Sequence, residues 1–214
     1  MRRLIQAVGC SAVIWAMVAL PAAAGDRGAS AVVRDFQAGL LATMKEAGRL
    51  GVKGRYERLA PLIERNVHLP LMIATASSPF WRQGTKEQKQ NLLAGFLRMS
   101  ASTLATLFDG YDGESFRVVR ERKPGGPTVL VDTEILRPDK DPIDITYVAA
   151  RLRDRWWIID IIVDGGISEV KVRRNEYLKL LTEGGLDRLT RALEDRATRL
   201  LSGQATAQAP GGAG

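Results

Sequence analysis

The sequence predicts an α+β fold in which helices come first, a four-stranded antiparallel meander sheet follows, and further helices close the chain. Before Gly110, apolar residues recur at the three- and four-residue steps of amphipathic helices. After Gly110, four runs rich in β-branched and aromatic residues follow one another, separated by short links. Such links allow antiparallel neighbours, because a parallel pair needs a long crossover. We expect the sheet to curve around the helices and to enclose an apolar cavity.

Residues 1–24 have the features of a secretory signal peptide. Arg2 and Arg3 precede a largely apolar segment over residues 4–20, and Pro-Ala-Ala-Ala follows with the small-x-small pattern of a signal-peptidase site. We expect cleavage after Ala24, a periplasmic mature protein, and loss of Cys10, the one cysteine. Lipidation is not expected, because the apolar segment continues beyond Cys10. The alternative is an uncleaved anchor, since this segment approaches the length needed to span a bilayer.

The remaining chain predicts one domain over residues 25–201 and a disordered, low-complexity tail over residues 202–214. The net charge of +7 falls to +5 when Arg2 and Arg3 leave with the signal peptide. An exported protein is not expected to bind nucleic acid. The basic excess therefore indicates either ordinary solubility or attraction to anionic membrane surfaces and acidic partners. We expect the protein to act as a monomer.

The first two helices are predicted from apolar stripes and breaker residues. The first covers residues 30–47, and Gly48 and Gly51 are expected to end it. The second covers residues 56–67, where Pro61 fits best near the first turn.

Two more helical segments follow before Gly110. His68-Leu69-Pro70 is expected to break the second helix, and residues 71–76 to form a short helical turn. Thr85 and Gln88 have the spacing of a capping box, which predicts a long helix from there to about Phe108.

The four strands and the last two helices complete the prediction. Strands are expected over residues 115–121, 128–136, 143–153 and 156–163. Helices are expected over residues 174–182 and 186–201, separated by Gly184-Gly185. The sequence leaves open which face of the sheet lines the cavity.

Motifs in both halves of the chain resemble those of a known family. They are PFWRQGTKEQKQNLLAGF in residues 79–96, WWIID before a glycine turn, Ile167-Ser168, Arg173-Arg174, Tyr177, and GGLDRL in residues 184–189. Their order, from about residue 30 to 201, resembles the MlaC family of periplasmic lipid carriers, also called the toluene-tolerance family. The segment GGISEVKVRRNEY is most similar to the corresponding segment of the hopanoid-associated HpnM branch. Phospholipid carriers more often show a Gly-Val-Ser turn followed by Tyr-Arg.

The resemblance implies a function as well as a fold. Lipid tails would lie between the sheet and the helices, with the head group near solvent. The carrier would move a hopanoid or a phospholipid between an inner-membrane ABC transporter and the outer membrane, without a cofactor and without enzymatic activity.

Several apolar residues are candidates for lipid contact, because their number favours a hollow, although each one alone is more typical of a packed core. These candidates are Met72, Phe96, Met99, Leu104, Val131, Tyr147, Ala149, Trp156 and Ile158. Arg173 and Arg174 are candidates for contact with a head group or a membrane partner, the alternative being a solvated basic face.

Two residues could support other functions. His68 is the one histidine, and without a cysteine in the mature chain it is expected to be structural and to bind no metal. Strand alternation places Asp160 in an apolar row with Ile158 and Ile162. It is therefore expected either to pair with a group such as Arg151 or to be the buried base of a small-molecule enzyme on a cone-shaped α+β fold. A periplasmic adaptor without a ligand is a third possibility.

Overall fold

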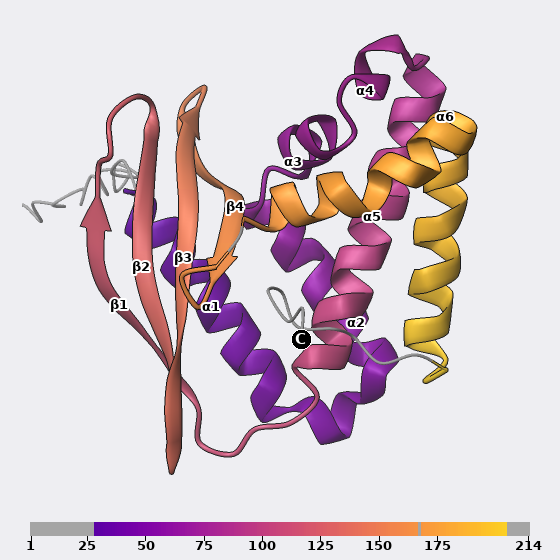
Figure 1. Cartoon of the computed structure of the whole chain (residues 1–214). Helices are drawn as coiled ribbons and strands as arrows, with labels where there is room; N and C mark the ends of the chain where they lie inside the picture. The colour runs from indigo at the N-terminus through magenta and orange to yellow at the C-terminus, as the bar shows by residue number, and fades with distance from the viewer. Residues whose placement is uncertain (1–27, 167, 205–214) are drawn as a thin grey trace, which may run out of the picture.

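The computed structural model describes residues 28–166 and 168–204, and over these ranges it is an α+β fold of six helices and one four-stranded sheet (Figure 1). Its elements follow the predicted order. The expected signal peptide, its cleavage site after Ala24 and residues 205–214 of the expected tail lie outside the described residues. Residues 202–204 form a turn after the last helix.

The sheet is an open antiparallel meander, as predicted. Its strands are β1 (Ser115–Arg122), β2 (Thr128–Arg137), β3 (Lys140–Leu152) and β4 (Arg155–Val163), paired in that order. One face of the sheet turns toward the helices and the other toward solvent (Figure 1). On the solvent side, arginines of β1 pair with carboxylates of β2, including Arg120 with Asp132 at 2.9 Å.

Helix α1 (Ala29–Lys45) crosses the inner face of the sheet and packs against all four strands. The Phe36 ring meets the Tyr147 ring edge to face, with centroids 6.2 Å apart. The Gln37 side-chain amide donates to the Thr133 hydroxyl at 3.0 Å, so the buried polar groups between helix and sheet are paired. At the N-terminus of α1, Glu121 of β1 accepts a hydrogen bond from the backbone N–H of Ser30 at 2.8 Å. A carboxylate there is favourable because the helix dipole is positive at that end.

The second helix begins earlier than the sequence predicts. Helix α2 spans Ala47–Asn66, with Glu46 alone between it and α1, so the expectation that Gly48 and Gly51 end the first helix is wrong. Gly51 instead bends α2, with a φ of 61° that glycine adopts without a steric cost. Pro61 lies inside α2, well beyond its first turn. The buried Arg55 secures the bend by donating to the carbonyls of Ala47 at 2.9 Å and of Ala105 at 2.7 Å.

Three helices follow before the sheet. Helix α3 (Leu69–Ala76) is capped by His68, whose Nδ1 accepts from the N–H of Leu71 at 3.1 Å. Helix α4 (Phe80–Gln83) is a single turn that the sequence analysis did not predict. Helix α5 (Lys86–Leu107) starts with the predicted capping box between Thr85 and Gln88.

The two predicted C-terminal helices are present as the two halves of one helical segment, and a sharp kink lies at the predicted break. Helix α6 spans Glu169–Leu201 and bends at Gly184 and Gly185, where φ is −166° and 63°. Its second half packs along α5, where Arg98 pairs with Glu194 at 2.6 Å. Its first half runs back to the end of β4 and lies beside α3 (Figure 1). This half starts at Glu169, a full turn earlier than predicted, and brings that turn to the interior of the molecule.

Candidate functional site

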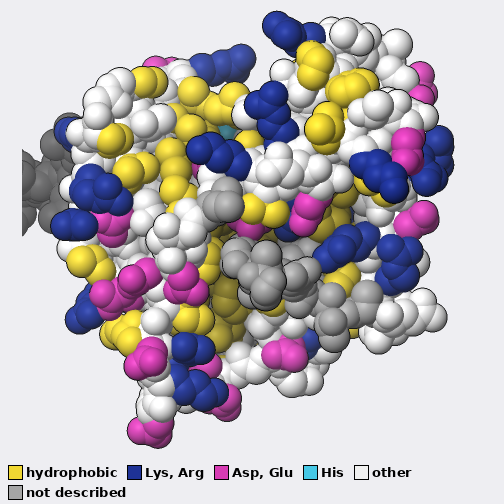
Figure 2. Space-filling view, viewed as in Figure 1, with side chains coloured by type: hydrophobic (Ala, Val, Ile, Leu, Met, Phe, Trp, Pro, Cys, Tyr) yellow, Lys and Arg dark blue, Asp and Glu magenta, His cyan; other side chains and the backbone are white. Residues whose placement is uncertain are grey.

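An apolar cavity of about 100 Å³ lies between the helices and the end of β4. On the face shown in Figure 2, hydrophobic side chains gather along the furrow between the sheet and the helices. The apolar part of the cavity wall comes from all the longer helices, from the α2–α3 link and from one strand. It consists of Phe36, Ile63, Val67, Leu69, Met72, Ala76, Phe96, Leu104, Ile161 and Val170, and the polar lining residues are Ser100, Thr103, Glu169 and Arg173.

Helical spacing explains why these residues meet. On α5, Phe96, Ser100 and Leu104 are four residues apart and therefore lie on one face. On α3, Met72 and Ala76 have the same spacing. The His68 side chain satisfies one of the free N–H groups at the start of α3 and so stabilises the helix that carries Met72 and Ala76.

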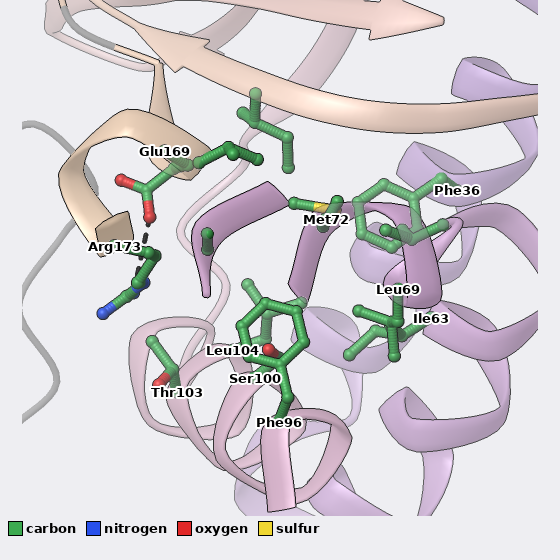
Figure 3. Close-up of a pocket in the computed structure, with 14 residues that line it drawn as sticks. Phe36, Ile63, Leu69, Met72, Phe96, Ser100, Thr103, Leu104, Glu169 and Arg173 are labelled. Carbon is green, nitrogen blue, oxygen red and sulfur yellow. Dashed lines mark ion pairs between the residues drawn. The ribbon is translucent and has the colours of Figure 1, made fainter. Parts of the chain in front are cut away.

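One end of the cavity is polar, and its groups come from the first turns of α6. In Figure 3 the Glu169 carboxylate and the Arg173 guanidinium lie on one side, and the rings and methyl groups of Phe36, Ile63 and Met72 lie on the other. Glu169 and Arg173 form an ion pair with a nitrogen–oxygen distance of 3.4 Å. Burial raises the pKa of Glu169 above its ordinary value, although the neighbouring Arg173 opposes that rise. The cavity therefore has an apolar interior and a polar end, which suits an amphiphile.

Asp160 fixes the position of this polar end. Its Oδ1 accepts hydrogen bonds from the backbone N–H groups of Ile161 at 2.8 Å and Val170 at 3.1 Å, and the Ser168 hydroxyl donates to its Oδ2. The same Ser168 caps α6 by accepting from the N–H of Lys171 at 3.1 Å. Asp160 thus joins the end of β4 to the start of α6, which is a structural role.

A β-bulge changes the faces of β4. Val148 of β3 pairs with Asp160 while the next residue, Ala149, pairs with Ile158, so Ile159 is the extra residue on β4. The expected row of Ile158, Asp160 and Ile162 is therefore wrong, because the bulge shifts the alternation by one position. Ile158 is buried in the core, and Ile161 is the β4 residue that reaches the cavity.

The structure divides the predicted contact residues into two groups. Met72, Phe96, Leu104 and Arg173 line the cavity. The others do not line it: Met99, Val131, Tyr147, Ala149 and Ile158 are at most 2% exposed within the packed core, and Trp156 is half-buried against that core. Arg174 is exposed to solvent on the outer side of α6.

Sequence reasoning missed several lining residues. Ile63 belonged to a predicted apolar stripe, so its pattern was visible, but its contact with the cavity was not. Ile161 was missed because the bulge at Ile159 changes the face of the sheet on which Ile161 lies. Glu169 was missed because the last helix was expected to begin later, although Ser168 followed by an acidic residue is a recognisable helix start.

A second, more open hollow of about 450 Å³ also borders the α2–α3 link. Val67 and Leu69 line both hollows. The second one also contains His68 and Trp157, whose rings meet edge to face with centroids 5.3 Å apart. The Arg155 guanidinium stacks 3.7 Å from the Trp157 ring centroid, so this hollow is bordered by a cation–π pair.

Within residues 28–166 and 168–204, no group of three or more His, Cys, Asp or Glu side chains is placed to hold a metal ion. Over the same residues, no helix combines the length and the apolar character needed to cross a bilayer.

The fold and the cavity define a small α+β protein whose cavity has apolar walls and one polar end. The chain belongs to the MlaC family, because the family model described as MlaC protein matches residues 35–195. Among solved structures, seven chains match. One is described as a phospholipid-binding protein from Ralstonia solanacearum in complex with a phospholipid. It is 20% identical in sequence, with a TM-score of 0.71 over 80% of this chain and 98% of its own, and so supports the fold. No curated protein matches the sequence.

Proposed function

We propose that this protein is a periplasmic lipid carrier that holds the hydrocarbon part of its ligand in the cavity and the polar part at the Glu169–Arg173 end. The observation that carries the proposal is the polarity of the cavity, with apolar walls along its length and an ion pair at one end. Membership of the MlaC family supports it. The phospholipid bound by the Ralstonia protein, which has the same fold, supports it further.

The cavity must widen to take a lipid. Its volume of about 100 Å³ is below the ~300–1,000 Å³ typical of small-molecule pockets. The helical side of the wall is suited to this change, because it is built from separate helices and includes the flexible side chain of Met72. We infer that α3 and the first half of α6 move outward when hydrocarbon enters.

The predicted contact residues take two roles in this proposal. Met72, Phe96 and Leu104 contact the hydrocarbon, while the fully buried candidates on the sheet support the wall from behind. Arg173 lies near the head group. Arg174, which points away from the cavity, is available to a membrane partner.

The wider route is part of the same proposal. The signal peptide is removed after Ala24, and the monomeric carrier moves a hopanoid or a phospholipid between an inner-membrane transporter and the outer membrane. The protein has no enzymatic activity in this account, and the structural contacts of Asp160 favour that view over a catalytic base.

The test is to identify what the protein carries. Protein purified from the native host is extracted with organic solvent, and the extract is analysed by mass spectrometry. We expect about one lipid per protein, and much less in the Ala76→Leu variant, because the larger side chain occupies the cavity. Folded protein without lipid would contradict the carrier and favour an adaptor without a ligand.

A further inference from the structure

The outer side of the first half of α6 is basic and carries an exposed leucine. Helical spacing places Lys171, Arg174 and Leu178 in one row, because they are three and four residues apart. Leu178 is 55% exposed, more than any other large hydrophobic residue that the structure describes. In Figure 2, Lys and Arg side chains lie beside hydrophobic ones over this half of α6. The exposed residues of this side are Lys171, Arg174, Asn175, Leu178, Lys179 and Thr182.

Over residues 169–183, no carboxylate lies on this side of the helix. Neither Lys171 nor Arg174 has an acidic residue three or four positions before or after it. Within residues 28–166 and 168–204, neither of them forms an ion pair. Lys179 approaches Glu183 at 3.9 Å, and its side chain remains 85% exposed. Pairing with an opposite charge one turn away, the common reason for charged residues on a helix surface, therefore does not account for these cations.

Helix stability does not account for them either. Lys171 is the third residue of α6, where the positive end of the helix dipole makes a cation unfavourable. The second half of the same helix has the ordinary arrangement. There Asp187, Arg191 and Asp195 follow one another at four-residue steps and are all exposed, so that opposite charges are neighbours. The two halves of α6 thus present different surfaces to solvent.

We propose that Lys171, Arg174, Leu178 and Lys179, here called the basic face, dock the protein on bilayers that contain anionic lipid. The three cations are attracted to the negative surface, and Leu178 enters the boundary between head groups and acyl chains. One Lys or Arg near such a surface strengthens binding about fivefold, so three give a preference for anionic over uncharged bilayers on the order of a hundredfold. Docking remains reversible, because a single leucine buries little apolar area.

A bilayer fits this face better than an acidic protein does. The basic face is one side of a half-helix of about 22 Å, whereas a stable protein interface buries about 800 Å² on each partner. Neither of the two hollows contains a residue of the basic face, so a protein partner would find no pocket there for an anchoring side chain. A bilayer needs no such pocket, because its charge is spread over a surface.

The position of the basic face links docking to the cavity. Glu169, Val170 and Arg173 line the cavity from the opposite side of the same turns of α6. A bilayer bound to the outer side would therefore lie about one helix diameter, about 10 Å, from the cavity. This inference goes beyond the proposed carrier function, since it concerns the outer surface and does not depend on which lipid is inside.

The test measures binding of the protein purified from the native host to sedimented vesicles. One set of vesicles is phosphatidylcholine alone, and in the other phosphatidylglycerol replaces part of the phosphatidylcholine. We expect binding to the anionic vesicles to be about tenfold or more tighter at low salt. Raising the salt concentration should reduce that preference, because ions screen the attraction between exposed charges.

Two double variants with the same change in net charge locate the docking face. Lys171→Gln with Arg174→Gln should weaken binding to anionic vesicles about tenfold or more, since two of the three cations are lost. Arg188→Gln with Arg191→Gln is the matched control, because these residues have the same spacing and are exposed on the second half of α6. Away from the bilayer their loss should change binding by less than about twofold.

A third variant tests the apolar part of the face. Leu178→Ser should weaken binding to anionic vesicles about threefold or more, because the leucine no longer enters the bilayer. Its thermal midpoint should stay close to that of the wild type, since the side chain is largely exposed in the folded protein. Unchanged vesicle binding in this variant would contradict the insertion of Leu178.

The outcomes separate docking from lipid carriage. Equal losses in the two double variants would show that binding follows net charge alone, and the inference would be wrong. Absence of binding to anionic vesicles would also overturn it and would leave the basic face to an acidic protein partner. Because extraction of the purified protein reveals its lipid independently, the carrier function would stand in both cases. Protein that docks through the basic face but contains no lipid would refute the carrier function and leave this inference intact.

Discussion

The sheet and the helices face the same interior, but the space lies almost entirely on the helical side. Residues of β2 and β3 that face inward, such as Val131, Tyr147 and Ala149, are at most 2% exposed and pack against α1. Of the four strands, β4 alone reaches the cavity, through Ile161. All other lining residues come from helices or from the α2–α3 link. The sheet and α1 therefore form a closely packed wall, and the remaining helices form the wall that borders most of the space.

Truncation of large side chains should give the largest difference between the two walls. Ile158→Ala, on the sheet, should lower the free energy of unfolding by about 3 to 5 kcal/mol, because it leaves a new void in a packed core. Met72→Ala should cost at most about 2 kcal/mol, because this side chain already borders empty space. Urea unfolding of the delipidated variants measures both values. Equal costs would show that the two walls are packed alike.

Asp160→Asn tests the connection between the walls. The substitution weakens the hydrogen bonds that hold the start of α6 to β4 and should cost about 1 to 3 kcal/mol. Lipid transfer by the protein that remains folded should change little. Asp154→Asn, in the exposed β3–β4 turn, is the control. Turnover of a small molecule that Asp160→Asn abolishes without a loss of stability would favour an enzyme instead.

Enlarging an alanine on each wall sharpens the comparison. Ala149→Leu should destabilise the protein by about 1 to 3 kcal/mol, since Ala149 is fully buried and lines neither of the two hollows. Ala76→Leu adds the same atoms to a residue that lines the cavity. We expect its unfolding free energy to stay within about 1 kcal/mol of the wild type while lipid uptake falls. The comparison fails if Ala149→Leu is tolerated and blocks lipid uptake.

The smallest effects should appear in the pH dependence of stability, with opposite signs on the two walls. On the outer face of the sheet, the Arg122 and Arg120 guanidiniums and the Thr146 hydroxyl hold the pKa of Asp132 well below its ordinary value, against the effect of burial. Asp132 therefore contributes stability that is present above about pH 4 and is lost as the pH falls further. Asp132→Asn should flatten that acid loss by about 1 kcal/mol or less, because both arginines are largely exposed.

Glu169 should show the reverse behaviour. Burial raises its pKa in the folded protein, so the folded state binds the proton more tightly than the unfolded chain does. Stability should then decline as the pH rises from about 4 through the raised pKa, and Glu169→Gln should remove that decline. Urea unfolding over a pH series measures both variants. A Glu169→Gln protein that keeps the decline would place its origin elsewhere.

Much of the fold was predictable because local patterns and tertiary packing agree. The capping box at Thr85 and Gln88 starts α5, and short links between strands allow one simple sheet topology. The predictions failed where a tertiary contact overrides the local pattern. Gly51 bends α2 and does not end it, because Arg55 holds the bend against the end of α5.

The cavity was harder to predict than the fold. Apolar periodicity identifies residues that face inward, but it does not distinguish a filled interior from a hollow one, which is why Tyr147 and Ala149 resembled Met72 and Phe96. The bulge at Ile159 leaves no clear signal in an uninterrupted apolar strand, and it decides which isoleucine reaches the cavity. Sequence alone suggested a basic site at Arg173, because the helix that brings Glu169 within 3.4 Å of it was expected to begin later.

The α2–α3 link borders both the cavity and the second, more open hollow. Val67 and Leu69 belong to both walls, and the N–H of His68 between them is bonded to the carbonyl of Ile158 at 2.8 Å. The two hollows therefore share one boundary. A displacement of this link toward one hollow would enlarge the other, so a molecule that pressed on the link from the second hollow would reduce the room in the cavity.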